Sequence, residues 1–278
     1  MCRKGKNIMK KYIQKWIILI TPLILICFVL FDKVLFEDSL FQGGDSLSPK
    51  AIRLGIDNAT SQFDEYPLWM PWIFSGMPSV HSFQNISEYY LPHLVMKVLM
   101  KIGIPQFWEF IFHFIFAGLG MIILLQYLKV RQTIAFFGGV SYMMIPYLIT
   151  MIVHGHGSQM MTTAFIPWVM WGILKLKDFP NTSNMGFLAL IIGLQLQRAH
   201  VQIAYYTWML VGLYIVLNII YYYKDKNRGI PELGLWALPA LFLGIMMSMW
   251  IYLPATSYTP FSIRGADGGG GTGLEYAT

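Results

Sequence analysis

The chain alternates between long apolar runs and short polar segments. The first run, Trp16–Phe31, follows six basic residues. Six further runs come later in the chain: Gln106–Leu128, Gln132–Val153, Met160–Leu174, Met185–Gln197, Val201–Tyr223 and Leu233–Leu253. A helix needs roughly 20 apolar residues to cross a bilayer, and somewhat fewer when its flanking side chains reach the interface. The pattern therefore predicts about seven membrane-spanning helices, of which the fourth and fifth are the shortest.

The first apolar run has two interpretations, because a cleaved signal peptide also begins with basic residues. The segment that follows this run, FDKVLFEDS, contains no small-residue cleavage site. We therefore expect an uncleaved first span.

The composition supports a membrane protein. Apolar residues make up 56% of the chain and charged residues only 12%, whereas soluble domains carry about 25% charged residues. The net charge of +6 comes from short basic clusters beside apolar runs. Such clusters indicate phospholipid headgroups as partners and argue against nucleic acid. Cys2 and Cys27 lie at the N-terminus and inside the first run, so no disulfide is expected.

The positions of the basic residues predict the orientation of the chain. If the N-terminus lies in the cytoplasm, the outer segments hold only seven of the 20 lysines and arginines, although these segments are the longer ones. Lysine and arginine are enriched in cytoplasmic segments. A cytoplasmic N-terminus is therefore predicted, and most of the polar motifs then fall on the outer face.

A long first outer loop is predicted over residues 32–104. Its last part, YYLPHLVMKVLMKIG, has an apolar stripe at helical spacing, with Lys97 and Lys101 on another face. The stripe consists of Leu91, Leu94, Val95, Val98, Leu99 and Ile102. We expect an amphipathic helix in the outer interface. Its lysines either hold lipid phosphates or extend to the headgroups as ordinary surface lysines do.

Three outer segments carry candidate functional residues. Asp45 in GGDSLSP is a candidate base or metal ligand, and its alternative role is in an Asx-turn. His154 and His156 in HGHGSQ are candidate metal ligands, contacts for a phosphate or sugar hydroxyl, or a polar corner that caps two helices. A metal site needs further ligands beyond these two. Arg198 and His200 belong to QRAH, and the guanidinium group fits a phosphate or a structural carboxylate partner.

The chain resembles bacterial YfhO-type membrane proteins. The segments that carry the resemblance occur in order: GGDSLSP, PLWMPWIFSGMP, HGHGSQMMTTAFIPWVMWGI, QLQRAHVQIAYY, YTPFSIRG and GLEYAT. The resemblance implies a GT-C-like glycosyltransferase, which is an all-α integral membrane fold with a lipid-phosphate-linked sugar donor. It also implies an acidic residue in the first outer loop, and Asp45 matches that position. Members of the family are typically longer, so residues 1–278 are expected to form the N-terminal part of such a transmembrane domain.

The implied reaction moves a sugar from a polyprenyl-phosphate donor to a cell-envelope glycan at the outer face of the bacterial cytoplasmic membrane. Asp45 would take the proton of the acceptor hydroxyl. No cofactor is firmly implied, although a divalent cation could hold the donor phosphate. Basic side chains are the alternative holders. They are Lys97, Lys101, His154, His156, Arg198, His200 and Arg264. Two other functions stay open, a non-enzymatic transporter or lipid-carrier flippase and an inactive scaffold.

Overall fold

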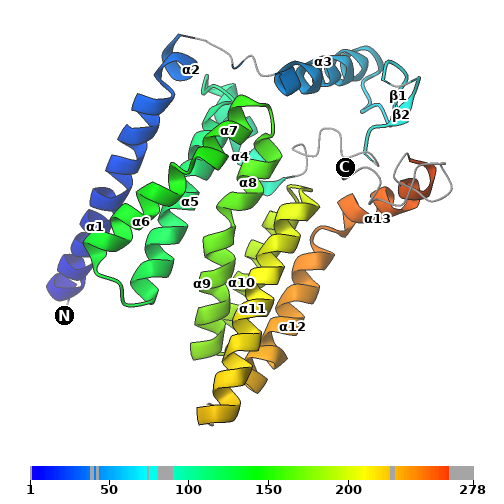
Figure 1. Ribbon diagram of the computed structural model, residues 1–278. Helices are drawn as coiled ribbons and strands as arrows, with labels where there is room; N and C mark the ends of the chain where they lie inside the picture. Colours follow the sequence, from blue (N-terminus) through cyan, green and yellow to red (C-terminus); the bar gives the residue numbers. More distant parts are fainter. Residues whose placement is uncertain are drawn as a thin grey trace.

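The computed structural model of the chain describes residues 2–37, 41, 44–73, 75–80, 90–225 and 229–262, and most of them are helical (Figure 1). The segment predicted as the first outer loop contains α3 (Gly44–Phe63), the short strands β1 (Trp69–Met70) and β2 (Met77–Pro78), and α4 (Leu91–Lys101). The remaining helices are α1 (Cys2–Leu30), α2 (Asp32–Phe36), α5 (Trp108–Tyr127), α6 (Gln132–Met143), α7 (Pro146–Val153), α8 (Gly157–Ala164), α9 (Ile166–Asp178), α10 (Thr182–Leu196), α11 (Val201–Asp225), α12 (Gly229–Met246), α13 (Met249–Tyr258) and a 3-10 turn at Thr259–Phe261.

Several of these helices are long and apolar enough to cross a membrane. In the described part of the chain they are Trp108–Tyr127, Gln132–Val153 and Val201–Tyr221. A fourth span results if the pair Leu233–Met246 and Met249–Phe261, bent by 66°, counts as one. Trp16–Leu30 and Thr182–Leu196 are apolar but shorter. The protein is thus an all-α membrane protein by length and composition, and helix length alone does not reach the expected seven spans.

The expected fourth span is divided in the structure. The run Met160–Leu174 falls into α8 and α9, which meet at Phe165. Pro167 lies in the first turn of α9, where proline is tolerated because its missing N–H would have no intrahelical partner. The apolar periodicity continues across this break, so the sequence pattern did not reveal it.

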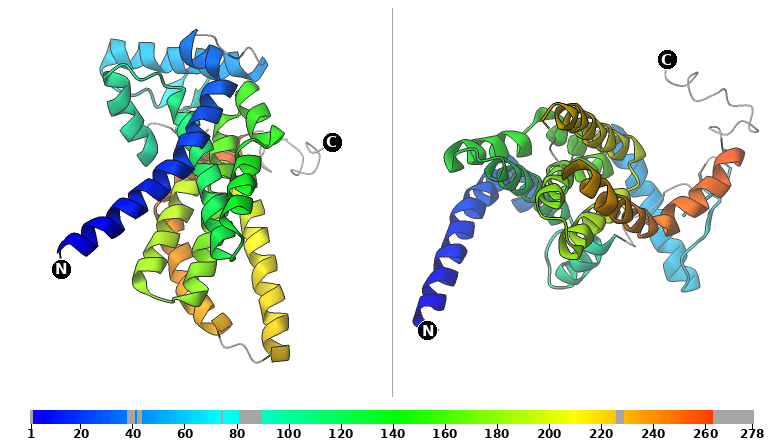
Figure 2. Two further views of the ribbon diagram at one scale, coloured as in Figure 1. Left: turned by 90° about the vertical axis from the view of Figure 1, so that its left-hand side faces the viewer. Right: turned by 90° about the horizontal axis from the view of Figure 1, so that it is seen from below.

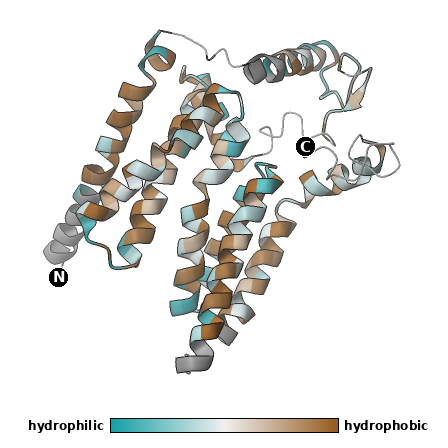
Figure 3. Ribbon diagram, in the orientation of Figure 1, coloured by the Kyte–Doolittle hydropathy of each residue, from teal (hydrophilic) through white to brown (hydrophobic). Residues whose placement is uncertain are grey.

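Successive long helices run in opposite directions, so that their connections gather at two ends of the bundle (Figures 1 and 2). The N-terminus, the α5–α6 turn and the end of α9 lie at one end. At the other end, which we call the outer end, lie α3, the α7–α8 corner and the α10–α11 corner. Hydrophilic residues concentrate at several helix ends, while apolar residues dominate along the helices (Figure 3). This grouping agrees with the alternation predicted from the basic residues, although the side of the membrane stays a prediction.

The helices pack around two apolar clusters. The first lies among α1 and α5–α8; α1 contributes Leu19, Leu23 and Cys27 at every fourth position, and Phe31 follows just after its end. The second lies mainly among α9–α12. Phe116 of α5 packs against both clusters. Its ring stacks on Trp168 at 4.6 Å, and Trp168 Nε1 donates to the Phe116 carbonyl oxygen at 2.9 Å. This contact joins the two clusters.

The amphipathic helix expected at residues 89–103 is present as α4. Its buried side chains are those of His93 and Met96, whereas Leu91, Val98 and Ile102 of the apolar stripe are 53%, 63% and 74% exposed. The stripe therefore points away from the bundle, as a lipid-facing surface would. The opposite face of α4 brings His93 into the protein.

Candidate functional site

Five polar side chains are buried together near the outer end of the bundle. Tyr90 precedes α4, His93 belongs to α4, Glu109 and His113 lie on the first two turns of α5, and Arg198 lies at the α10–α11 corner. Their exposed fractions range from 0% to 6%. We call these five residues the polar cluster. Buried charges in an apolar protein are costly unless they are paired or used, so this cluster is the leading candidate for a site.

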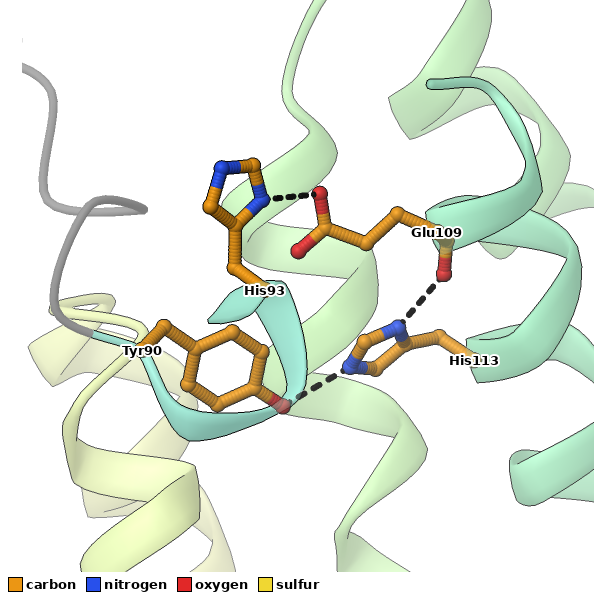
Figure 4. Close-up of polar contacts among 4 residues, drawn as sticks. All are labelled: Tyr90, His93, Glu109 and His113. Carbon is orange, nitrogen blue, oxygen red and sulfur yellow. Dashed lines mark hydrogen bonds and ion pairs between the residues drawn. The ribbon is translucent and has the colours of Figure 1, made fainter. Parts of the chain in front are cut away.

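Glu109 and His93 form a close pair inside the cluster. His93 Nδ1 lies 2.8 Å from Glu109 Oε2 (Figure 4). An ionised carboxylate only accepts hydrogen bonds, so Nδ1 of His93 carries the hydrogen and donates it. Carboxylates fix the orientation of imidazole rings in this way at many metal and catalytic sites.

His113 is bonded at both of its ring nitrogens. Its Nδ1 lies 2.7 Å from the backbone carbonyl oxygen of Glu109, and its Nε2 lies 2.8 Å from the Tyr90 hydroxyl (Figure 4). A carbonyl oxygen can only accept, so Nδ1 donates and the neutral ring accepts from Tyr90 at Nε2. His113 thereby connects α5 to the start of α4.

Arg198 contacts the cluster through the ring of Tyr90. Its guanidinium carbon lies 4.5 Å from the centre of the Tyr90 ring, which is a favourable cation–π distance. Burial lowers the pKa of Arg198, and the nearby Tyr90 and Glu109 oppose this shift. Burial likewise raises the pKa of Tyr90, against the effect of Arg198. The guanidinium group and the Glu109 carboxylate thus offset each other's charge in a poorly solvated region.

The α10–α11 corner, which carries Arg198, is held in place by polar contacts of two glutamines. Gln195 Nε2 donates to Thr207 Oγ1 at 2.9 Å, and Gln197 Nε2 donates to the Met247 carbonyl oxygen at 3.0 Å. Between Arg198 and His200, Ala199 has φ +52°. Non-glycine residues seldom adopt this left-handed conformation, and such residues are often found at functional sites.

The Glu109–His93 pair has two polar atoms that could each form a further hydrogen bond. Within the part of the chain that the structure describes, His93 Nε2 and Glu109 Oε1 are buried and have no hydrogen-bond partner. They lie on different sides of the hydrogen bond that joins the pair (Figure 4). Buried polar atoms are nearly always satisfied, so these two atoms indicate a place where a ligand or water can bind.

The two histidines of HGHGSQ lie outside this cluster. His154 is exposed, and its Nδ1 donates to the Thr150 carbonyl oxygen at 2.9 Å at the end of α7, which is the helix-capping arrangement. His156 is exposed at the start of α8. It lies close enough to His200 to affect that ring: burial lowers the pKa of His200, and the charge of His156 lowers it further. The two corners are therefore neighbours, as expected.

The other predicted residues are not brought into the cluster by any described contact. Lys97 is partly buried on α4, and Lys101 is exposed in its last turn. Asp45 is the second residue of α3, which lies across the outer end (Figures 1 and 2). The side chain of Asp45 and all of Arg264 lie outside the described residues.

Of this cluster, only Arg198 was predicted from the sequence as a site residue. Glu109 is an isolated acid at the edge of an apolar run, and an ionisable residue in such a position is itself a functional signal. His93 and Tyr90 lie within the predicted amphipathic segment, and no local pattern there marks them as site residues. No spacing rule connects α4, α5 and the α10–α11 corner, because only the folded chain brings them together.

Among the described residues there is no group of three or more histidine, cysteine or acidic side chains placed to hold a metal ion. Comparison with protein-family models, curated proteins and solved structures finds no match to this chain.

Proposed function

We propose that the chain is a membrane glycosyltransferase of the GT-C type, using a polyprenyl-phosphate-linked sugar. The supporting observation is the buried Arg198 beside the Glu109–His93 pair, at the end of the bundle where the polar loops gather. A guanidinium group at this depth is suited to a phosphate at the boundary between headgroup and apolar region. The proposed location is the outer face of the bacterial cytoplasmic membrane, and the proposed acceptor is an envelope glycan.

The proposed roles follow the chemistry of each group. Asp45 takes the proton of the acceptor hydroxyl, as the resemblance implies. Arg198 holds the donor phosphate, whose negative charge grows as the sugar leaves. His156 and His200, on neighbouring corners of the same end, offer imidazole N–H groups that can donate to the donor phosphate or to sugar hydroxyls. The full count of seven spans belongs to this proposal, with α1 and α10 as short spans and α8 and α9 together as one.

The first test is sugar transfer by the wild-type chain in proteoliposomes. A panel of undecaprenyl-phosphate hexoses and N-acetylhexosamines, labelled in the sugar, serves as donors, with envelope glycan as acceptor. We expect Asp45→Asn to reduce transfer by about 100-fold or more, because the positioned carboxylate is lost. Arg198→Gln is expected to weaken donor binding in addition to slowing turnover.

The matched control is Asp57→Asn on the same helix α3, which removes an acid of the first outer loop that the proposal does not use. It should keep wild-type transfer. Transfer that is equal in wild type and Asp45→Asn would overturn the role of Asp45. Movement of the intact lipid-linked sugar across the bilayer, without transfer, would support a flippase instead.

A further inference from the structure

The polar cluster contains two buried histidines that differ in one respect. Both ring nitrogens of His113 have protein partners, the Glu109 carbonyl oxygen and the Tyr90 hydroxyl. His93 has one partner, the Glu109 carboxylate, and its Nε2 has none among the described residues. Both side chains are buried, at 0% and 5% exposure. The position of His113 is therefore explained by structure alone, and that of His93 is not.

The hydrogen bond to Glu109 determines which proton of His93 can be exchanged. Because the carboxylate accepts from Nδ1, the hydrogen on Nδ1 is retained in both forms of the ring. The exchangeable proton is then the one on Nε2, the atom that faces away from Glu109 (Figure 4). A carboxylate orients the imidazole ring of a catalytic triad in the same way, through Nδ1, while Nε2 exchanges a proton.

We propose that His93, oriented by Glu109, donates its Nε2 proton to the polyprenyl phosphate as it leaves the sugar. This inference rests on the proposed function, and it adds an acid on the phosphate side to the base proposed on the acceptor side. Arg198 belongs to the same side, since its guanidinium group lies over Tyr90 within the same cluster. Neither His93 nor Glu109 was implied by the resemblance.

The bond between the anomeric carbon and the phosphate oxygen breaks, and its electron pair stays on that oxygen, which receives the proton from His93 Nε2. The acceptor oxygen forms the new bond to the anomeric carbon, and its proton passes to Asp45. Afterwards water takes the proton from Asp45 and returns one to His93. No oxidant, reductant or metal ion is required.

Other ionisable side chains lie near His93 and could also change their protonation with pH. Glu109 contacts it from α5, Tyr90 lies one turn before it, and Lys97 lies one turn later on α4. His113 and Arg198 lie near Glu109 on the other side of the pair. Since His93 is fully buried, a phosphate reaches Nε2 when the groups that cover it move. Of the α4 side chains, only His93 and Met96 are buried, so this helix is lightly held.

The test uses His93→Asn, because an asparagine amide can occupy the position of Nδ1 and still donate to Glu109 while it lacks Nε2. The matched control is His113→Asn, the same change at the histidine whose two nitrogens have structural partners. Both are assayed in proteoliposomes with the undecaprenyl-phosphate sugar that the wild-type chain turns over. We expect turnover of His93→Asn to fall by about 100-fold or more, with KM nearly unchanged, and His113→Asn to stay within a few-fold of wild type.

The pH dependence separates an acid from a structural residue. An acid must be protonated to act, so wild-type turnover should decrease toward alkaline pH. This alkaline limb should disappear in His93→Asn and persist in His113→Asn. If His93→Asn is unfolded, His93→Gly supplies the readout, because added imidazole should restore its transfer.

Each negative result has its own meaning. Absence of transfer by the wild-type chain with every donor would overturn the proposed function. Transfer that depends on Asp45 but is unchanged in His93→Asn, or absence of imidazole rescue in a folded His93→Gly, would overturn the role of His93 alone.

Discussion

The Tyr90 hydroxyl satisfies one nitrogen of a fully enclosed imidazole. Its hydrogen bond to His113 Nε2 is 2.8 Å long, and the phenol ring also carries Arg198 at 4.5 Å. The two contacts depend on different parts of the same side chain, because the hydroxyl makes the first and the ring face makes the second. Substitution can therefore separate them.

Tyr90→Phe should destabilise the protein by about 1–3 kcal/mol, because His113 Nε2 loses its donor while it stays buried. The ring contact with Arg198 should persist. Thermal unfolding in lipid nanodiscs measures the effect, with Tyr206→Phe as the control, since that exposed residue's hydroxyl accepts a hydrogen bond from Gln202 on the surface of α11. Equal unfolding temperatures for the two variants would show that the buried hydrogen bond contributes no stability.

At the scale of the helices, small residues allow α5 and α6 to approach closely. A side chain on Gly139 of α6 would lie 2.7 Å from the Gly118 carbonyl oxygen of α5 and would also collide with Ile122. Backbone atoms cannot move aside as a flexible side chain can, so the absence of a side chain is what allows this approach. This packing positions α5, and therefore Glu109 and His113.

Gly139→Ala should destabilise the α5–α6 pair by about 1–3 kcal/mol through overpacking. Gly212→Ala on α11 is the control, since nothing lies within 4 Å of the added carbon. We expect Gly139→Ala to unfold at a lower temperature in nanodiscs and Gly212→Ala to match wild type. Similar values for both would mean that α5 and α6 can separate without loss of stability.

A helix was predictable from the sequence where one local pattern of residues determines it. The α4 stripe appears in the sequence at helical spacing, and the exposed Leu91, Val98 and Ile102 confirm its amphipathic character. The division at Phe165 and the bend after Met246 were not predicted, because the apolar pattern continues through both. The polar cluster was also missed, since His93 and Glu109 meet only through the packing of α4 against α5.

At the scale of the whole molecule, the chain has two chemically distinct ends. The connection that contains Arg131 lies at the end opposite to the corner that contains His154 (Figure 1). Both residues are exposed. If basic residues mark the cytoplasmic side, the site lies at the outer surface.

This orientation predicts the result of cysteine labelling in intact cells. In a chain with Cys2→Ser and Cys27→Ala, a membrane-impermeant maleimide should label His154→Cys and leave Arg131→Cys unlabelled. Permeabilised cells provide the control, since both variants should then react. Labelling of Arg131→Cys alone in intact cells would reverse the predicted orientation and place the polar cluster on the cytoplasmic side.

In the proposed arrangement, the exposed stripe of α4 places lipid next to the helix that carries His93. Of its side chains only His93 and Met96 are buried, and in the proposed orientation acyl chains lie against its outer side. A bilayer leaflet offers such a helix a flat surface, whereas a detergent micelle offers it a curved one. In the proposed arrangement, the geometry between His93 and Glu109 is therefore expected to differ between a bilayer and a detergent micelle.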